Sequence, residues 1–337
     1  MFHPVITDVE GLEISAEERA LFKEFRPYGF ILFQRNCDNP DQVKKLTDQM
    51  KEIIGNPDAP ILIDQEGGRV ARLKPPHWPN YPAAGAYSKL YDDNPELAAA
   101  AVQVHARLIA SDLLNVGVNV DCFPVADIFY EGADKVIGDR AYGDYAEKVT
   151  RLARAAAEGM IAGGVTPVIK HIPGHGRADV DSHKSLPRVD TALDELKKTD
   201  FIPFRKLNDF PCAMTAHVIY SAIDSEKCAT VSRKIIGDII RGEIAFRGVL
   251  FSDDLSMKAL NKAPEQNALD ALEAGCDLAL HCNGNLEARH AVLKATIDKK
   301  LEAENRLDYF FKKKRISSEI DHDQLYDWLS GVMKGYE

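Results

Sequence analysis

Short apolar runs alternate along the chain with longer stretches in which apolar residues recur at the spacing of an amphipathic helix. Most of the apolar runs are nearly continuous, which is typical of parallel strands that are covered on both faces. These runs predict eight strands: Val5–Val9, Gly29–Phe33, Ile61–Asp64, Val118–Pro124, Pro167–His171, Cys212–Ala216, Gly248–Ser252 and Leu278–His281. The intervening stretches predict eight helices: Ala16–Phe25, Pro40–Ile54, Pro95–Val116, Tyr145–Gly163, Leu193–Asn208, Ser232–Ala245, Pro264–Ala274 and Leu286–Lys299.

This alternation of strands and helices predicts an α/β fold, a single (β/α)8 barrel of the TIM type with long loops after its strands and a helical C-terminal tail. A doubly wound open sheet is the main alternative, but it usually places its ligand at one switch point. Polar residues follow most of the predicted strands here, which favours the closed barrel. We expect residues 1–300 to form the barrel domain that carries the active site, and residues 301–337 to form a helical extension packed on it. The proline-rich run Lys74–Pro82 is expected to be a loop over the barrel mouth.

The composition is ordinary for a globular protein, with 45% hydrophobic and 28% charged residues. The formal net charge of −10 argues against nucleic acid or an anionic membrane as the main partner, because both favour a basic surface. The N-terminus lacks a basic segment followed by an apolar core, and no run of about 18 apolar residues occurs, so we expect a cytoplasmic protein without a membrane span. The six cysteines are scattered, which indicates reduced thiols. We expect a monomer that acts on a small molecule.

The segment from Lys170 to His183 concentrates ionisable side chains directly after a predicted strand. Its proline and glycines prevent a regular helix, so it is expected to be an irregular loop on a rigid scaffold, where enzymes often place reactive groups. The active site of a TIM-type barrel lies beyond the C-terminal ends of the strands. Ionisable side chains follow these ends at Asp64, Glu66, Arg69, Arg72, Asp127, Arg140, Lys170, His171, His217, Asp253 and Asp254.

Two pairs of side chains predict reactive groups. Adjacent residues at a strand end face opposite ways, so one of Asp253 and Asp254 is expected to reach an electrophilic carbon while the other caps a helix or orients its neighbour. Asp181 lies two residues before His183. At that spacing a carboxylate can hold an imidazole in one tautomer and raise its pKa, which makes the imidazole a positioned proton donor. A solvated surface loop is the simpler alternative for His183.

The other polar residues fit the binding of a sugar better than the binding of a metal. Lys170 and Arg140 can donate to hydroxyl groups, and Asp64 can accept from two hydroxyls, although an ion pair with a nearby arginine is the alternative for Asp64. His171 and His175 have the spacing of a zinc-binding pair, but the proline and glycine between them break the helix that such a pair requires. We therefore expect neither a metal nor another cofactor.

Four motifs stand in order along the chain: Ile63-Asp-Gln-Glu-Gly-Gly-Arg-Val70, Lys170-His-Ile-Pro-Gly-His-Gly176, Asp181-Ser-His183 and Phe251-Ser-Asp-Asp-Leu-Ser-Met257. Three further segments accompany them: Ile137-Gly-Asp-Arg-Ala-Tyr142, Met214-Thr-Ala-His-Val-Ile-Tyr220 and Ala274-Gly-Cys-Asp277. Together they resemble the bacterial β-N-acetylglucosaminidases of glycoside hydrolase family 3, over residues 5–285. One departure is Ile172, where many members of the family carry phenylalanine.

The resemblance implies a retaining exo-enzyme that removes terminal N-acetylglucosamine from peptidoglycan fragments, the GlcNAc-anhydroMurNAc peptides of cell-wall recycling. It also implies that Asp253 is the nucleophile and that His183 is the general acid/base, with Asp181 as its partner. By the same resemblance, the residues that bind the N-acetylglucosamine unit are Asp64, Arg72, Arg140, Lys170 and His171.

Four alternatives to this function stay open. A neutral imidazole base would not repel phosphate, so the enzyme could be an N-acetylglucosaminide phosphorylase, or it could be another β-glycosidase on the same fold. A metal-dependent barrel hydrolase would use His171, His175 and Asp253. A sugar-binding barrel without catalytic activity would have little need for both Asp253 and the pair formed by Asp181 and His183.

Overall fold

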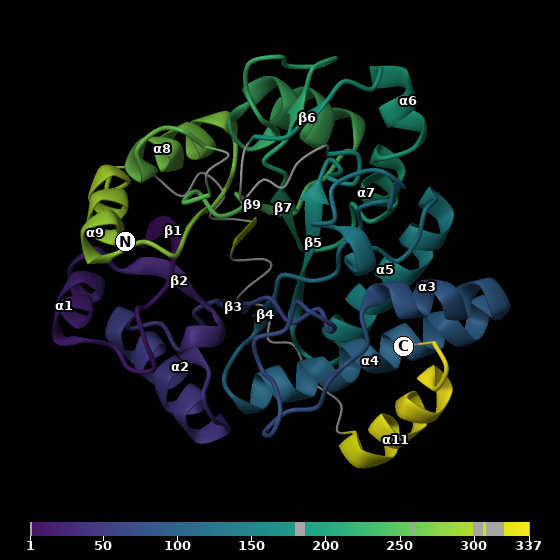
Figure 1. Ribbon diagram of the computed structural model, residues 1–337. Coiled ribbons are helices and arrows are strands. Elements are labelled where there is room, and N and C mark those ends of the chain that lie inside the picture. Colours follow the sequence, from purple (N-terminus) through teal and green to yellow (C-terminus); the bar gives the residue numbers. More distant parts are fainter. Residues whose placement is uncertain (1, 179–185, 258–259, 299–305, 308–319, 337) are drawn as a thin grey trace.

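The computed structural model describes residues 2–178, 186–257, 260–298, 306–307 and 320–336. Parallel strands form its centre, and helices surround them (Figure 1). The strands of this central sheet are β1 (His3–Thr7), β2 (Pro27–Leu32), β3 (Ile61–Ile63), β4 (Val120–Asp121), β5 (Thr166–Ile172), β7 (Cys212–Thr215), β9 (Val249–Phe251) and β10 (Ala279–His281). From β1 to β9 each strand pairs with the next of this series, and β10 pairs with β1. All eight predicted strands are therefore present, with small differences in their ends.

The gap between β9 and β10 is closed by hydrogen bonds. Phe251 and Leu278 form a parallel bridge. The Ser252 amide donates to the Leu278 carbonyl at 3.0 Å, and the Leu280 amide donates to Ser252 Oγ at 2.8 Å. The sheet is therefore a closed (β/α)8 barrel of the TIM type, and the open doubly wound sheet is excluded.

β4 is shorter than the sequence predicts, and its polar residues have a structural purpose. Asn119 Oδ1 accepts from the Ile61 amide at 2.8 Å, and Asp121 Oδ1 accepts from the Gln65 amide at 3.0 Å. The two side chains thus hydrogen-bond the backbone at the start of β3 and just after its end. Pro124 has no amide hydrogen to donate to the ladder, although its carbonyl accepts from the Lys170 amide at 3.1 Å.

The described helices are α1 (Ala16–Phe25), α2 (Pro40–Ile54), α3 (Ala84–Asp93), α4 (Pro95–Asn115), α5 (Ala146–Ala162), α6 (Leu193–Lys198), α7 (Phe201–Lys206), the π-helix η4 (Ile235–Glu243), α8 (Pro264–Ala274), α9 (Leu286–Ala295) and α11 (His322–Met333). Short 3₁₀ turns occur at η1 (Gln34–Asn36), η2 (Gly138–Arg140) and η3 (Ala229–Val231), and the two-residue strands β6 (Arg188–Val189) and β8 (Ile219–Tyr220) pair outside the barrel.

Helices begin and end as predicted where the caps are strong. Ser15 and Glu18 form a capping box at the start of α1, and Asn39 caps α2, which ends at Gly55 in the left-handed conformation. The predicted helix Leu193–Asn208 is instead two short helices. The break falls where the Asp200 carboxylate accepts from Arg177 Nε at 2.8 Å and from Thr199 Oγ1 at 2.7 Å. Helix α3 was not predicted from the sequence, and η4, predicted as an ordinary helix, is a π-helix.

Each of the eight strands contributes side chains to the packed interior of the barrel. This inner cluster includes Ile6, Ile31, Leu62, Val120, Val168, Met214, Phe251 and Leu280. A second, larger cluster lies between the strands and the surrounding helices. All six cysteines are buried free thiols, as predicted. A filled interior leaves the ends of the strands as the place for a binding site.

The C-terminal helix α11 packs outside α4 (Figure 1). His322 Nε2 lies 3.2 Å from Asp112 Oδ1, and the rings of Tyr81 and Tyr326 are in edge contact. By length and composition α4 could cross a membrane, but half of its most apolar window is buried against the rest of the protein, as in a core helix. The predicted domain boundary at residue 300 lies outside the described residues.

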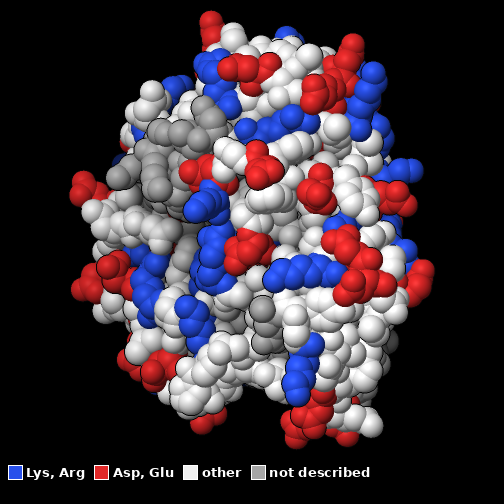
Figure 2. Space-filling model, turned by 45° about the vertical axis from the view of Figure 1, so that its right-hand side comes forward, with Lys and Arg blue, Asp and Glu red and all other residues white. Residues whose placement is uncertain are grey.

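The surface carries both signs of charge. In the face drawn in Figure 2, acidic and basic side chains are interspersed, and among the described residues no broad basic area stands out there. Such a mixed surface fits the negative net charge of the chain.

Candidate active site

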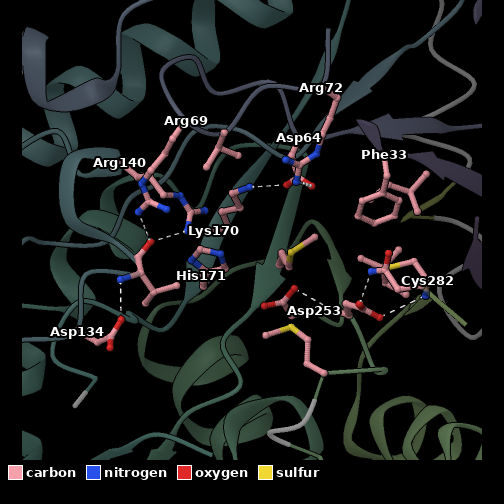
Figure 3. Close-up of a pocket in the computed structure, with 18 of the residues that line it drawn as sticks. Phe33, Asp64, Arg69, Arg72, Asp134, Arg140, Lys170, His171, Asp253 and Cys282 are labelled. Carbon is pink, nitrogen blue, oxygen red and sulfur yellow. Dashed lines mark hydrogen bonds and ion pairs between the residues drawn. The ribbon is translucent and has the colours of Figure 1, made fainter. Parts of the chain in front are cut away.

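A cavity of about 790 Å³ opens at the C-terminal ends of the strands (Figure 3). Six residues that the sequence analysis selected line this one cavity: Asp64, Arg72, Arg140, Lys170, His171 and Asp253. In the view of Figure 3, Asp253 lies on the opposite side of the opening from Asp64 and Arg72. The barrel therefore brings together residues that are up to 189 positions apart in the sequence (253 minus 64).

One wall of the cavity is a network of alternating carboxylates and cations. Lys170 Nζ lies 2.8 Å from Asp64 Oδ1 and 2.7 Å from Glu66 Oε1. Arg140 binds Glu66 with two hydrogen bonds of 2.7 and 2.8 Å, and Arg72 Nη2 lies 3.1 Å from Asp64 Oδ2. Two carboxylates and three cations leave this wall with one net positive charge.

The network sets the ionisation of its own members. Burial by itself would favour the neutral acids, but Lys170 and Arg72 hold the pKa of Asp64 well below its usual range. Arg140 and Lys170 likewise overcome the effect of burial and lower the pKa of Glu66 to about 2. In turn, although burial opposes it, the two carboxylates raise the pKa of Lys170. Asp64, Glu66, Lys170 and Arg140 are therefore all charged at neutral pH.

Glu66→Gln should destabilise the protein in a pH-dependent way. Removing one charge of a buried pair typically costs about 3–5 kcal/mol in the free energy of unfolding, because its partners stay charged. The pKa of Glu66 is lowered on folding, so its contribution is full above its unfolded pKa of 4.5 and disappears as the pH falls toward about 2. Chemical denaturation of wild type and variant at several pH values should show the largest difference near pH 7.

The matched control for this variant is Glu96→Gln. Glu96 pairs with Arg151 at the surface, where its side chain is 85% exposed, and such pairs contribute little. Equal losses of stability in the two variants, or a loss in Glu66→Gln that is the same at pH 7 and at pH 3, would contradict the account of the buried network.

The neighbouring wall is organised by the buried carboxylate of Asp127. Its Oδ2 lies 2.7 Å from His171 Nδ1, and its Oδ1 accepts from the His175 amide at 2.7 Å. With Nδ1 occupied by Asp127, the other nitrogen of His171 is the one that a ligand can meet. Burial and the neighbouring His171 lower the pKa of His175 to about 4, so this imidazole is neutral at pH 7. The peptide bond between Lys170 and His171 is cis.

Asp121 lies under the site, at the end of β4, and is fully buried. Burial raises the pKa of this carboxyl well above its usual range, although the Gln65 amide donates to it. The folded protein therefore holds a proton that the unfolded chain, with a pKa of 3.8, releases. The contribution of Asp121 to the free energy of unfolding therefore decreases as the pH rises from the pKa of this carboxyl in the unfolded chain toward its pKa in the folded protein.

Asp121→Asn should remove this loss of stability at higher pH. Asparagine keeps the acceptor for the Gln65 amide but does not titrate, so the variant should be as stable as the wild type near pH 4 and at least as stable at pH 7. Denaturant unfolding at both pH values measures the effect. A variant whose stability follows the wild-type pH dependence would show that Asp121 is not the group responsible.

The two carboxylates after β9 have different surroundings. Asp254 is part of the scaffold: its carboxylate accepts from the Ser256 amide at 3.0 Å, from Ser256 Oγ at 2.7 Å and from Asn283 Nδ2 at 3.0 Å. Both aspartates line the cavity, and Asp253 Oδ1 accepts from the Asp254 amide at 2.8 Å. Asp254 thus orients the turn through its hydrogen bonds to Ser256 and Asn283.

Other expectations are untested or wrong. Asp181 and His183 lie outside the described residues. The run Lys74–Pro82 does not line the cavity; Tyr81 is instead buried against α4, with its hydroxyl 2.7 Å from Asp112 Oδ2. Among the described residues, no cluster of three or more His, Cys, Asp or Glu side chains is arranged to hold a metal ion.

The structure adds residues to which the sequence analysis gave no role. Glu66 lies inside the first motif, but only the fold shows that it binds Lys170 and Arg140. Arg69 supports the far rim: its guanidinium donates to Asp139 Oδ1 at 2.8 Å and to the carbonyl of Val136 at 2.7 Å. Apolar side chains complete the lining, from Phe33, Met214, Met257 and Leu280.

The comparisons with known proteins agree with this geometry. The model of the Glycosyl hydrolase family 3 N terminal domain matches residues 5–317. A protein named Beta-hexosaminidase from Alkalilimnicola ehrlichii is 43% identical over 86% of this chain and 83% of its own length, and one from Pseudomonas aeruginosa is 35% identical over 97% and 96%. The crystal structure of NagZ from Neisseria gonorrhoeae in complex with N-trifluoroacetyl-D-glucosamine superposes with a TM-score of 0.87, at 30% identity and 98% coverage of both chains. The chain belongs to glycosyl hydrolase family 3 and is a glycoside hydrolase.

Proposed function

We propose that this enzyme is a retaining exo-β-N-acetylglucosaminidase that removes terminal N-acetylglucosamine from peptidoglycan fragments of the GlcNAc-anhydroMurNAc type. The observation that carries the proposal is the single cavity in which Asp253 faces the charged wall of Asp64, Lys170 and Arg72. The names of the relatives support the sugar, since they are called β-hexosaminidases and the Neisseria structure is a complex with an N-acylated glucosamine.

The charged wall suits one sugar ring. A sugar hydroxyl can donate to Asp64 while it accepts from Lys170, because the two groups are adjacent and both are ionised. Arg72 and Arg140 supply further donors, and His171 offers the ring nitrogen that does not meet Asp127. Charge-assisted hydrogen bonds of this kind are the stronger ones, and a cavity that places them around one ring favours cleavage at the end of a chain.

In the proposed reaction the Asp253 carboxylate attacks the anomeric carbon and forms a glycosyl-enzyme. His183, protonated and held by Asp181, gives its proton to the departing oxygen. The neutral imidazole then takes a proton from water, the water oxygen attacks the anomeric carbon, and Asp253 leaves as a carboxylate. Two displacements at the same carbon restore the β configuration in the product.

Rates on a matched pair of aryl substrates test the proposed specificity. The nitrophenyl β-N-acetylglucosaminide should be cleaved at least about 100-fold faster than the nitrophenyl β-glucoside, because the second lacks the acetamido group that a site built for it would bind. Proton NMR during the reaction should show the β anomer of free N-acetylglucosamine first. An α anomer as first product, or faster cleavage of the glucoside, would contradict the proposal.

Product analysis in the presence and absence of inorganic phosphate distinguishes hydrolysis from phosphorolysis. The proposal expects free sugar in both cases, whereas a sugar phosphate would assign the enzyme to the phosphorylases.

We also propose that the protein is a cytoplasmic monomer and that the leaving group of its reaction is the peptide-bearing sugar. Fractionation of cells and light scattering of the pure protein would test the first two points.

A further inference from the structure

His217 is a buried imidazole directly behind the turn that carries the two aspartates after β9. It follows β7 and is fully buried. Its Nε2 lies 2.9 Å from the carbonyl oxygen of Asp254. A carbonyl can only accept, so Nε2 carries a hydrogen, and this hydrogen bond fixes the backbone one residue after Asp253.

The other ring nitrogen meets a threonine network. His217 Nδ1 lies 2.7 Å from Thr230 Oγ1, which also lies 2.8 Å from Thr215 Oγ1 and donates to the Ala216 carbonyl at 3.2 Å. A hydroxyl has a single hydrogen. If Thr230 gives it to the carbonyl, the hydroxyl oxygen accepts from Nδ1, and both nitrogens of His217 carry a hydrogen.

The charges around His217 favour this doubly protonated form. Burial alone would lower the pKa of His217, but contact with Cys228 and the negative charge of Asp253 raise it to about 9. Besides the side chain of Cys228, the hydrogen-bond partners of the imidazole are Thr230 and the Asp254 carbonyl, and both are neutral. The positive charge of Lys170, in contrast, is shared between two carboxylates. His217 thus supplies a positive charge that no described carboxylate binds directly.

We propose that His217 is a positioning residue that acts as an imidazolium: it holds the Asp253–Asp254 turn in place and stabilises the negative charge of the Asp253 carboxylate. This inference rests on the proposed role of Asp253 as nucleophile. That carboxylate must be ionised to attack the sugar and must leave as an anion when water releases the sugar, so a buried cation behind it assists both steps.

Other groups also face Asp253 and must be held constant in any test. The described titratable groups around Asp253 and His217 include Cys122 after β4, Lys170, His171 and His175 on or after β5, Cys228 beside His217, Asp254, and Asp64, Arg72 and Arg140 across the cavity. Variants at His217 and Thr230 leave all the others unchanged. The charge on His217 is therefore separable from the charged wall that binds the sugar.

The experiment compares His217→Gln and Thr230→Val with the wild type. Glutamine can place an amide nitrogen near the position of Nε2 and donate to the Asp254 carbonyl without a charge. Valine has the shape of threonine but removes the acceptor for Nδ1. For an activated aryl N-acetylglucosaminide, the acid limb of kcat/KM should move to higher pH by about one unit in His217→Gln, and by less in Thr230→Val. The affinity for N-acetylglucosamine itself should be unchanged, because the sugar contacts are intact.

A purely structural role would lower kcat without moving the acid limb, and that result would overturn the proposal. Variants with the same kcat and the same acid limb as the wild type would also overturn it.

Nitrogen-15 NMR of the histidine rings provides a second readout that needs no activity. The His217 signals, assigned by their absence from His217→Gln or by their shift in Thr230→Val, should be those of an imidazolium at pH 7 and should titrate above pH 8. A neutral ring at pH 7 would overturn the proposal even if the enzyme proved to act on another sugar. If the ring is an imidazolium but the enzyme has no N-acetylglucosaminidase activity, only the proposed substrate is rejected.

Discussion

Asp253→Asn should reduce turnover of an aryl N-acetylglucosaminide by about 10⁴–10⁶-fold, the range seen when a covalent nucleophile is removed. The physical reason is that an amide oxygen is a poor nucleophile, whereas the carboxylate lines the cavity opposite Asp64 and Arg72. Because asparagine has the shape of aspartate and its side-chain oxygen can still accept from the Asp254 amide, the variant should still fold and bind N-acetylglucosamine. Steady-state rates together with calorimetric binding of the product check both parts.

The neighbouring carboxylate provides the matched control. Asp254→Asn changes the residue that holds Ser256 and Asn283, so it should lower stability by about 1–3 kcal/mol and leave far more activity than Asp253→Asn. Azide offers a positive test in Asp253→Ala, because a small anion can enter the space of the lost carboxylate and form the α-glycosyl azide. A larger loss of turnover in Asp254→Asn than in Asp253→Asn would show that the two roles are exchanged.

His183→Ala should reduce cleavage of substrates with poor leaving groups by about 10²–10⁴-fold, the usual contribution of a general acid or base. The reduction should be far smaller for the first step with a dinitrophenyl leaving group, which departs without a proton. Pre-steady-state measurements separate this step from the release of the sugar, in which the same imidazole acts as a base. Comparison of a natural disaccharide with the dinitrophenyl glycoside therefore gives a difference that depends on leaving-group pKa.

Asp181→Asn is the companion variant. It keeps a hydrogen-bonding side chain but removes the charge that stabilises the imidazolium, so it should show the same dependence on the leaving group with a smaller loss. Equal losses on both substrates in His183→Ala would remove the proton-donor role from His183. These predictions rest on the sequence and on the family, because both residues lie outside the described part of the chain.

The barrel could be predicted from the sequence because its signals are local. Each strand is a short apolar run, and α1 and α2 carry their own caps at Ser15, Asn39 and Gly55. Asp253 and Asp254 lie just after β9, as the sequence predicts, and they line the cavity because the C-terminal ends of barrel strands converge. The motifs of the family then selected the residues that line the cavity.

The unpredicted parts depend on contacts between distant segments. Glu66 and Arg140 are 74 residues apart, so no local pattern shows that they bind each other. Asp127 and His171 meet only because β4 and β5 are neighbours in the barrel. The break before α7 likewise follows from the ion pair between Asp200 and Arg177, which lies outside the predicted helix. Side-chain pairing across the fold, and not periodicity, determines these features.

The most direct test of the central claim is to trap the sugar on the protein. A fluorinated N-acetylglucosaminyl fluoride reacts in the first step but releases its sugar slowly, so the covalent intermediate should accumulate. Peptide mass spectrometry should then find one added sugar, attached to Asp253 and absent from Asp253→Asn. An adduct on another residue, or slow retaining turnover without any adduct on the protein, would contradict the account.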